Sequence, residues 1–123
     1  DPARALLAAA AEGAVRATTT PEAIQEFAHV RARRRDRAEA AALAASYADL
    51  LSPLLEVGEE DLREGLRVFE STGALGAFDA VLAAVALRAG ASALVSADRA
   101  FATVRRLPFL DLEGLDVEAL QGP

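Results

Sequence analysis

The sequence predicts an α/β sandwich in which a mainly parallel central sheet is flanked by helices. Short apolar runs alternate along the chain with longer segments of helical periodicity, and this alternation is typical of α/β folds. The strands of such a sheet should be short apolar runs, because helices cover both of its faces. With 123 residues the chain is long enough for one sizeable core, so we expect a single domain spanning residues 1–123.

The elements that this reading predicts follow one another closely. In chain order we expect a helix at residues 2–13, a strand at 14–19, a helix from 21 into the arginines at 31–37, a helix at about 36–51, a strand at 54–57, a helix at 59–72, a helix at 78–90, a strand at 92–96, a short helix from about 99 and a strand at 109–112.

Local signals mark the ends of these helices. Asp1 is a candidate N-cap of the first helix. Thr20 and Pro21 form a strong start, because a capping hydroxyl precedes a proline at the first helical position. Glu22 then faces the positive end of the helix dipole. Glycines end three of the helices, at Gly13, Gly73 and Gly90.

Composition excludes several classes of protein. The net charge of −6 argues against a protein that coats nucleic acid through bulk charge. No run approaches the ~18 consecutive apolar residues of a membrane span, and the first residues lack the features of a signal peptide. Without cysteine the chain has neither a disulfide framework nor a thiolate metal site. We therefore expect a soluble, cytoplasmic protein with no membrane partner.

Two aspartates are expected at the same edge of the sheet. Asp98 follows the predicted strand 92–96, and ligands of such folds gather at the carboxyl ends of strands. Asp79 heads the apolar helix before that strand. The helix leads away by about 15 Å and the strand returns by about 17 Å, so both acids reach one edge. Each also has a simpler interpretation as a helix N-cap.

Carboxylates that meet at one edge favour a bound cation. Their mutual repulsion costs stability unless a cation neutralises it. A site with oxygen ligands, no cysteine and a single histidine suits magnesium or manganese rather than zinc. A third acid is expected from Glu26, at the margin of the apolar face made by Ala23, Phe27 and Val30, although in isolation it reads as an exposed helix glutamate.

Three segments resemble a known family. TTPEAIQEF, GAFDAVLAAVALRAG and ALVSADRAF, in that order and spacing, are similar to the PIN domain and specifically to the VapC-type toxins of type II toxin–antitoxin systems, over roughly residues 14–112. The resemblance implies a PIN-like three-layer sandwich and a metal-dependent endoribonuclease. It also implies a homodimer that is inhibited by a cognate, VapB-like antitoxin whose tail enters the active-site groove.

The resemblance also implies the site residues. The catalytic and metal-binding acids would be Glu26, Asp79 and Asp98, with Ser96 lining the site and Mg²⁺ or Mn²⁺ as cofactor. The ions would lower the pKa of a bound water and orient it for in-line attack on an RNA phosphodiester.

Arginine provides all 13 basic side chains, and several are clustered after Val30. Their planar guanidinium groups suit phosphate recognition. The candidates for binding RNA phosphates outside the acidic site are Arg31, Arg33, Arg34 and Arg35. The alternatives are contact with the antitoxin or a solvated helix end. His29 is expected on the surface. No glycine-rich phosphate loop, GxGxxG or GxSxG segment is present.

The sequence departs from the family at its start. PIN domains open with a strand that ends in an aspartate, and no such segment precedes the first predicted helix, so we expect that the domain lacks its first strand here.

The sequence leaves three hypotheses for the function of the protein. The first is the ribonuclease toxin, the second is a catalytically inactive PIN-like module for protein binding or dimerisation, and the third is a nuclease that acts on DNA.

Overall fold

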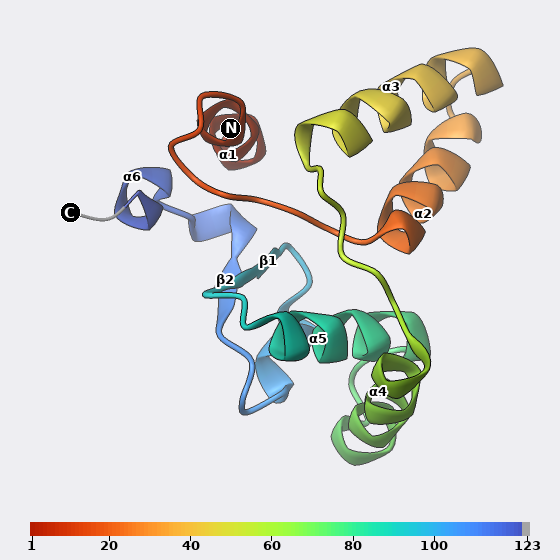
Figure 1. Cartoon of the computed structure of the whole chain (residues 1–123), viewed down its shortest axis with the longest axis vertical. Helices are drawn as coiled ribbons and strands as arrows, with labels where there is room; N and C mark the ends of the chain where they lie inside the picture. Colours follow the sequence, from red (N-terminus) through yellow and green to blue (C-terminus); the bar gives the residue numbers. More distant parts are fainter. Residues whose placement is uncertain (122–123) are drawn as a thin grey trace. The chain divides into compact units, whose positions relative to one another are not determined.

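The computed structural model describes residues 1–121 and divides the chain into two compact units (Figure 1). Leu6–Glu56 form one unit, which we call the helical unit. Asp1–Ala5 and the chain from Val57 onward form the other, which we call the sheet unit. The elements occur in the order α1 (Pro2–Ala11), α2 (Pro21–Ala32), α3 (Arg37–Leu50), α4 (Glu59–Thr72), α5 (Ala77–Ala89), β1 (Leu94–Ser96), the 3₁₀ helix η1 (Arg99–Thr103), β2 (Phe109–Asp111), the 3₁₀ helix η2 (Leu112–Gly114) and α6 (Val117–Leu120).

Two predicted helix starts, at Asp1 and at Thr20, are confirmed by their caps. The Asp1 carboxylate accepts a hydrogen bond from the backbone N–H of Ala3, at 3.0 Å. Thr20 Oγ1 accepts one from Ala23 at 3.1 Å, with Pro21 as the first residue of α2. Each cap satisfies a backbone donor that the first turn of a helix leaves unpaired.

The three predicted glycine stops are also confirmed. Gly13, Gly73 and Gly90 all have positive φ angles, of 80°, 68° and 68°. Glycine adopts this left-handed conformation without the steric cost that a Cβ atom would add, and it therefore ends helices readily.

Two predicted strands are wrong. Neither residues 14–19 nor residues 54–57 form a strand. The two segments do lie side by side, because the backbone N–H of Leu55 donates to the carbonyl oxygen of Thr19 at 2.9 Å and Thr18 Oγ1 donates to the carbonyl oxygen of Pro53 at 2.8 Å. One backbone bond and one side-chain bond do not make a ladder, so the segments stay extended without pairing as strands.

The sheet unit contains a parallel pair of strands, in agreement with the predicted α/β class. β1 pairs with β2 in the register Leu94 to Phe109, Val95 to Leu110 and Ser96 to Asp111. The ladder is continued at its start by a hydrogen bond from the N–H of Leu94 to the carbonyl oxygen of Pro108, at 2.8 Å.

Helices α4 and α5 pack closely beside this pair. A Cβ atom on Gly65 of α4 would lie only 2.6 Å from Cα of Val81 on α5, so the two backbones approach as closely as glycine allows. The buried Asp61 carboxylate of α4 accepts a 2.7 Å hydrogen bond from Nε of Arg88 on α5. A core of buried residues joins α4 and α5 to the segment around η1, namely Val68, Leu75, Ala80, Ala83, Phe101, Val104 and Leu107.

No single helix among residues 1–121 is long and apolar enough to cross a membrane. Helices α4 and α5, which are sharply bent relative to each other, reach the length and apolar composition of a membrane span only when they are taken together.

Candidate active site

The turn after β1 holds Asp98 by two hydrogen bonds. Ser96 Oγ accepts one from the backbone N–H of Asp98, at 3.0 Å. Asp98 Oδ1 in turn accepts one from the N–H of Ala100, at 2.9 Å, which makes Asp98 the N-cap of η1. The capping role predicted for Asp98 is therefore confirmed. Its second carboxylate oxygen, Oδ2, makes no hydrogen bond within residues 1–121, and the side chain is exposed.

Asp79 does not cap its helix. Helix α5 begins at Ala77 with Gly76 as its N-cap, so Asp79 is the third helical residue. The capping interpretation was wrong because the helix extends further toward the N-terminus than its apolar pattern indicated. The carboxylate lies in the first turn, where the positive end of the helix dipole favours a negative charge, and the residue is half-buried.

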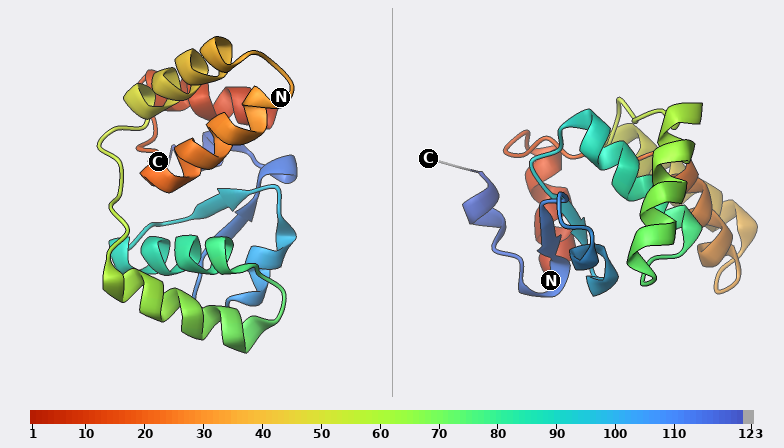
Figure 2. Two further views of the ribbon diagram at one scale, coloured as in Figure 1. Left: turned by 90° about the vertical axis from the view of Figure 1, so that its right-hand side faces the viewer. Right: turned by 90° about the horizontal axis from the view of Figure 1, so that it is seen from below.

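The start of α5, which carries Asp79, and the end of β1, which precedes Asp98, lie at the same end of the sheet unit. In the left view of Figure 2, β1 runs back against the direction of α5, so the start of α5 and the end of β1 both lie on the right. Packing supports this arrangement, because Ala80, next to Asp79, and Phe101, three residues after Asp98, belong to one buried cluster. A shared apolar core thus anchors both acidic segments.

Glu26 belongs to the helical unit. It is exposed on α2, where Ala23 and Phe27 of the neighbouring apolar face are half-buried and Val30 is exposed. The structure therefore gives Glu26 the surroundings of an ordinary surface glutamate, and its part in the site stays a prediction.

A complete metal-ligand set is not assembled in the part of the chain that the structure describes. Among residues 1–121, no three histidine, aspartate or glutamate side chains lie close enough together to hold one ion. Mg²⁺ in proteins commonly uses only one or two carboxylates and keeps several waters or takes substrate phosphates. Asp79 and Asp98 supply carboxylate oxygens of this kind, so the donor chemistry fits a partly hydrated magnesium or manganese ion.

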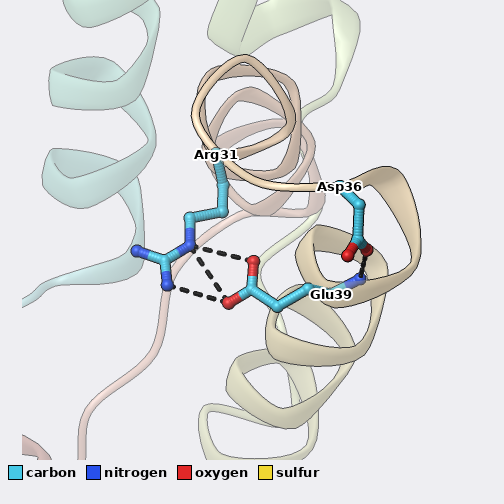
Figure 3. A network of polar contacts seen from close by, with 3 residues as sticks. All are labelled: Arg31, Asp36 and Glu39. Atoms are coloured by element: carbon cyan, nitrogen blue, oxygen red, sulfur yellow. Dashed lines mark hydrogen bonds and ion pairs between the residues drawn. The ribbon is translucent and has the colours of Figure 1, made fainter.

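Arg31, one of the arginines predicted to bind RNA, already forms an ion pair with another residue of the chain. Its Nη2 and Nε donate to the Glu39 carboxylate at 2.8 Å and 3.2 Å, which joins α2 to α3 (Figure 3). These bonds hold the pKa of the Glu39 carboxyl below its ordinary value and raise the pKa of Arg31. In the same figure Asp36 accepts from the N–H of Glu39 and caps α3.

The other three arginines of the cluster are exposed, namely Arg33, Arg34 and Arg35. The Arg33 guanidinium lies 3.2 Å from Nε2 of His29, which is on the surface as predicted. These three side chains are therefore better placed than Arg31 to bind an external phosphate.

Asp111 was missed by the sequence reasoning. It ends β2 directly opposite Ser96 and accepts a 2.9 Å hydrogen bond from Nε of Arg99. This bond, with a second from the N–H of Glu113, lowers the pKa of Asp111. The signal that identified Asp98 also applies to Asp111, because it too is an acid at the end of a short apolar strand.

Comparisons with known proteins identify the family. Residues 1–107 match the family model of the PIN domain, and the chain belongs to this family. It is 56% identical over 106 residues to Ribonuclease VapC7 of Mycobacterium tuberculosis (strain ATCC 25618 / H37Rv), an alignment that covers 83% of this chain and 71% of that protein. No solved structure matches the chain significantly. The predicted resemblance to VapC-type PIN proteins is confirmed, and with it the PIN-like α/β fold class. The expectation that the domain lacks the opening strand of the family stays a prediction.

Proposed function

We propose that the protein is a metal-dependent endoribonuclease toxin of the VapC type. The observation that carries the proposal is the placement of Asp79 and Asp98 at one end of the sheet unit, in a chain that is 56% identical to a ribonuclease. The proposal includes a cytoplasmic homodimer and inhibition by a VapB-like antitoxin.

The acids of the chain have distinct parts in this proposal. Asp98 offers its Oδ2 atom, because Oδ1 is occupied by the N–H of Ala100. Asp79 would contribute its carboxylate from the first turn of α5, and Glu26 would complete the set. Ser96 fixes the backbone that presents Asp98. A Mg²⁺ or Mn²⁺ ion held by these carboxylates would supply an activated water and charge stabilisation for phosphodiester hydrolysis.

The exposed arginines would bind the RNA backbone. Arg33, Arg34 and Arg35 present guanidinium groups that suit phosphate oxygens. Replacing all three with glutamine is expected to weaken RNA binding and to flatten its dependence on salt, because fewer counterions are released when the complex forms. Binding with an unchanged salt dependence would assign these side chains to antitoxin contact or to solubility instead.

Cleavage by carboxamide variants tests the nuclease assignment. Asp79→Asn and Asp98→Asn keep the side-chain shape but remove the negative charge, and each should slow Mg²⁺-dependent cleavage of RNA by about 100-fold or more. Asp116→Asn is the matched control, because Asp116 is another exposed aspartate that caps a helix of the sheet unit. Wild-type rates for both Asp79→Asn and Asp98→Asn would overturn the proposal.

The non-catalytic PIN-like module is the second candidate. The observation that favours it is the lack of a three-acid cluster among residues 1–121. Wild-type protein that leaves RNA intact with either Mg²⁺ or Mn²⁺, but still dimerises or binds its antitoxin, would support this module. Cleavage of DNA in preference to RNA would support the DNA nuclease instead.

A further inference from the structure

We infer that Arg99 and Asp111 are positioning residues, whose ion pair holds the Asp98 turn against the end of β2 so that the Asp98 carboxylate is presented for metal binding. The inference rests on the proposed function, which makes Asp98 a ligand. It adds two residues to the site that neither the family match nor the relative assigns.

Asp111 is a fixed anchor. It is in register with Ser96 at the last paired position of the two strands. Both of its carboxylate oxygens are occupied, since Oδ1 accepts from the N–H of Glu113 at 3.0 Å and Oδ2 accepts from Nε of Arg99 at 2.9 Å. Its side chain is 24% exposed, so the strand and the neighbouring turn restrict its movement.

Arg99 connects Asp111 to Asp98, the candidate metal ligand. It follows Asp98 directly and is the first residue of η1. The exposed chain between Ser96 and Arg99 is also held by three short-range hydrogen bonds, from the N–H of Asp98 to Ser96 Oγ, from the N–H of Ala100 to Asp98 Oδ1 and from the N–H of Phe101 to the carbonyl oxygen of Asp98. Of these hydrogen bonds, the one from Arg99 reaches the second strand, across twelve residues of sequence. It lies beside the stacked rings of Phe101 in η1 and Phe109 in β2, whose centroids are 6.4 Å apart.

Because Arg99 is exposed, the Arg99–Asp111 ion pair can position the Asp98 turn without contributing much to the stability of the whole fold. The Arg99 side chain is 83% exposed, and ion pairs of exposed groups contribute little to the stability of a fold. Groups that orient a metal ligand nonetheless affect metal affinity strongly, typically by 10–100-fold. The pair should therefore matter for the order of the Asp98 turn and for metal binding, with little effect on the melting temperature.

Amide exchange and Mn²⁺ binding of the full chain without RNA test the inference. In Arg99→Gln and Asp111→Asn, we expect the Ala100 amide to exchange about fivefold faster and the Mn²⁺ affinity to fall about tenfold. Arg99→Lys keeps the cation and should recover part of both losses. Arg67→Gln, which breaks the exposed Arg67–Glu64 pair of α4, is the matched control and should change neither.

The outcomes distinguish this inference from the proposed function. Wild-type exchange and Mn²⁺ affinity in both Arg99→Gln and Asp111→Asn would overturn the inference, as would equal changes in Arg67→Gln. If the wild type binds no Mn²⁺, the proposed function fails, and the Ala100 exchange alone then decides whether the ion pair orders the turn.

Cleavage kinetics separate positioning from direct RNA contact. Cleavage by Arg99→Gln should recover at high Mn²⁺ concentration, with the KM for RNA unchanged. A raised KM that added Mn²⁺ does not restore would overturn the inference, because Arg99 would then contact the RNA itself.

Discussion

Two helix pairs in this protein are held together in different ways. In the sheet unit, α4 and α5 meet through the backbone contact at Gly65 and through the Asp61–Arg88 pair, in which the carboxylate side chain is only 6% exposed. In the helical unit, α2 and α3 meet through the more exposed Arg31–Glu39 pair and an edge-to-face contact between Phe27 and Tyr47, with ring centroids 5.1 Å apart.

The difference bears on the candidate acids. Asp79 lies in the first turn of a helix whose following residues, Ala80, Ala83 and Ala84, are almost fully buried, so its position is determined by a packed core. Glu26 is on a helix with no buried residue. Packing therefore restrains one acid much more than the other, and perturbations of the sheet unit should have the larger effects on stability.

Gly65→Ala should have the largest effect. Alanine would ordinarily stabilise a helix interior, but here its Cβ atom would meet Val81 at 2.6 Å. We expect a loss of about 2–3 kcal/mol in the free energy of unfolding, measured by urea denaturation, because overpacking forces the helices apart. Gly114→Ala is the control, since a Cβ atom there meets nothing within 4 Å. Equal stability of Gly65→Ala and the wild type would show that α4 and α5 are not closely packed.

Asp61→Asn should have the second largest effect and should depend on pH. It removes a charged partner of Arg88 and is expected to cost about 2 kcal/mol at pH 7. Because the Arg88 hydrogen bond lowers the pKa of Asp61 from 3.8, the folded protein binds a proton less readily than the unfolded chain. The stabilisation is therefore present above pH 3.8 and is lost as the pH falls through the lower, folded-state value.

Urea denaturation at several pH values checks this effect. The difference between wild type and Asp61→Asn should shrink steadily below pH 3.8. Glu60→Gln removes a neighbouring exposed charge and should show no such pattern. A difference that stays constant with pH would mean that the ion pair does not stabilise the fold.

Arg31→Gln should have the smallest effect. The side chains of Arg31 and Glu39 are 34% and 38% exposed, so water and salt screen the attraction between them. We expect a melting temperature lowered by about 2 °C or less, and by less still at high salt. Arg34→Gln, at an exposed arginine of the same cluster, is the control. A loss as large as that of Asp61→Asn would remove the distinction between the two helix pairs.

Helices were predictable where their signals are local. Thr20 with Pro21 marks the start of α2, and Gly73 and Gly90 mark the ends of α4 and α5, because capping and left-handed conformations depend on one or two residues. Strands were less predictable, since a strand needs a partner elsewhere in the chain. Residues 14–19 and 54–57 have the composition of strands but share only the Leu55–Thr19 backbone bond.

The candidate site was predictable only where its signals are local in the sequence. Asp98 stands out because it comes two residues after the end of an apolar strand. Its partnership with Arg99 and Asp111 depends on the register of β1 with β2, which the sequence pattern does not specify. The engagement of Arg31 with Glu39 likewise depends on how α2 folds back along α3.

Selective broadening of amide NMR signals by Mn²⁺ tests most directly whether the acids surround one ion. At low Mn²⁺ concentration, we expect the amides of Ala80 and Ala100 to broaden first and together, Phe27 next to Glu26 to broaden with them, and Asp98→Asn to remove the effect at all three. Broadening scattered over the surface, or broadening at Ala80 that persists in Asp98→Asn, would contradict a shared metal site.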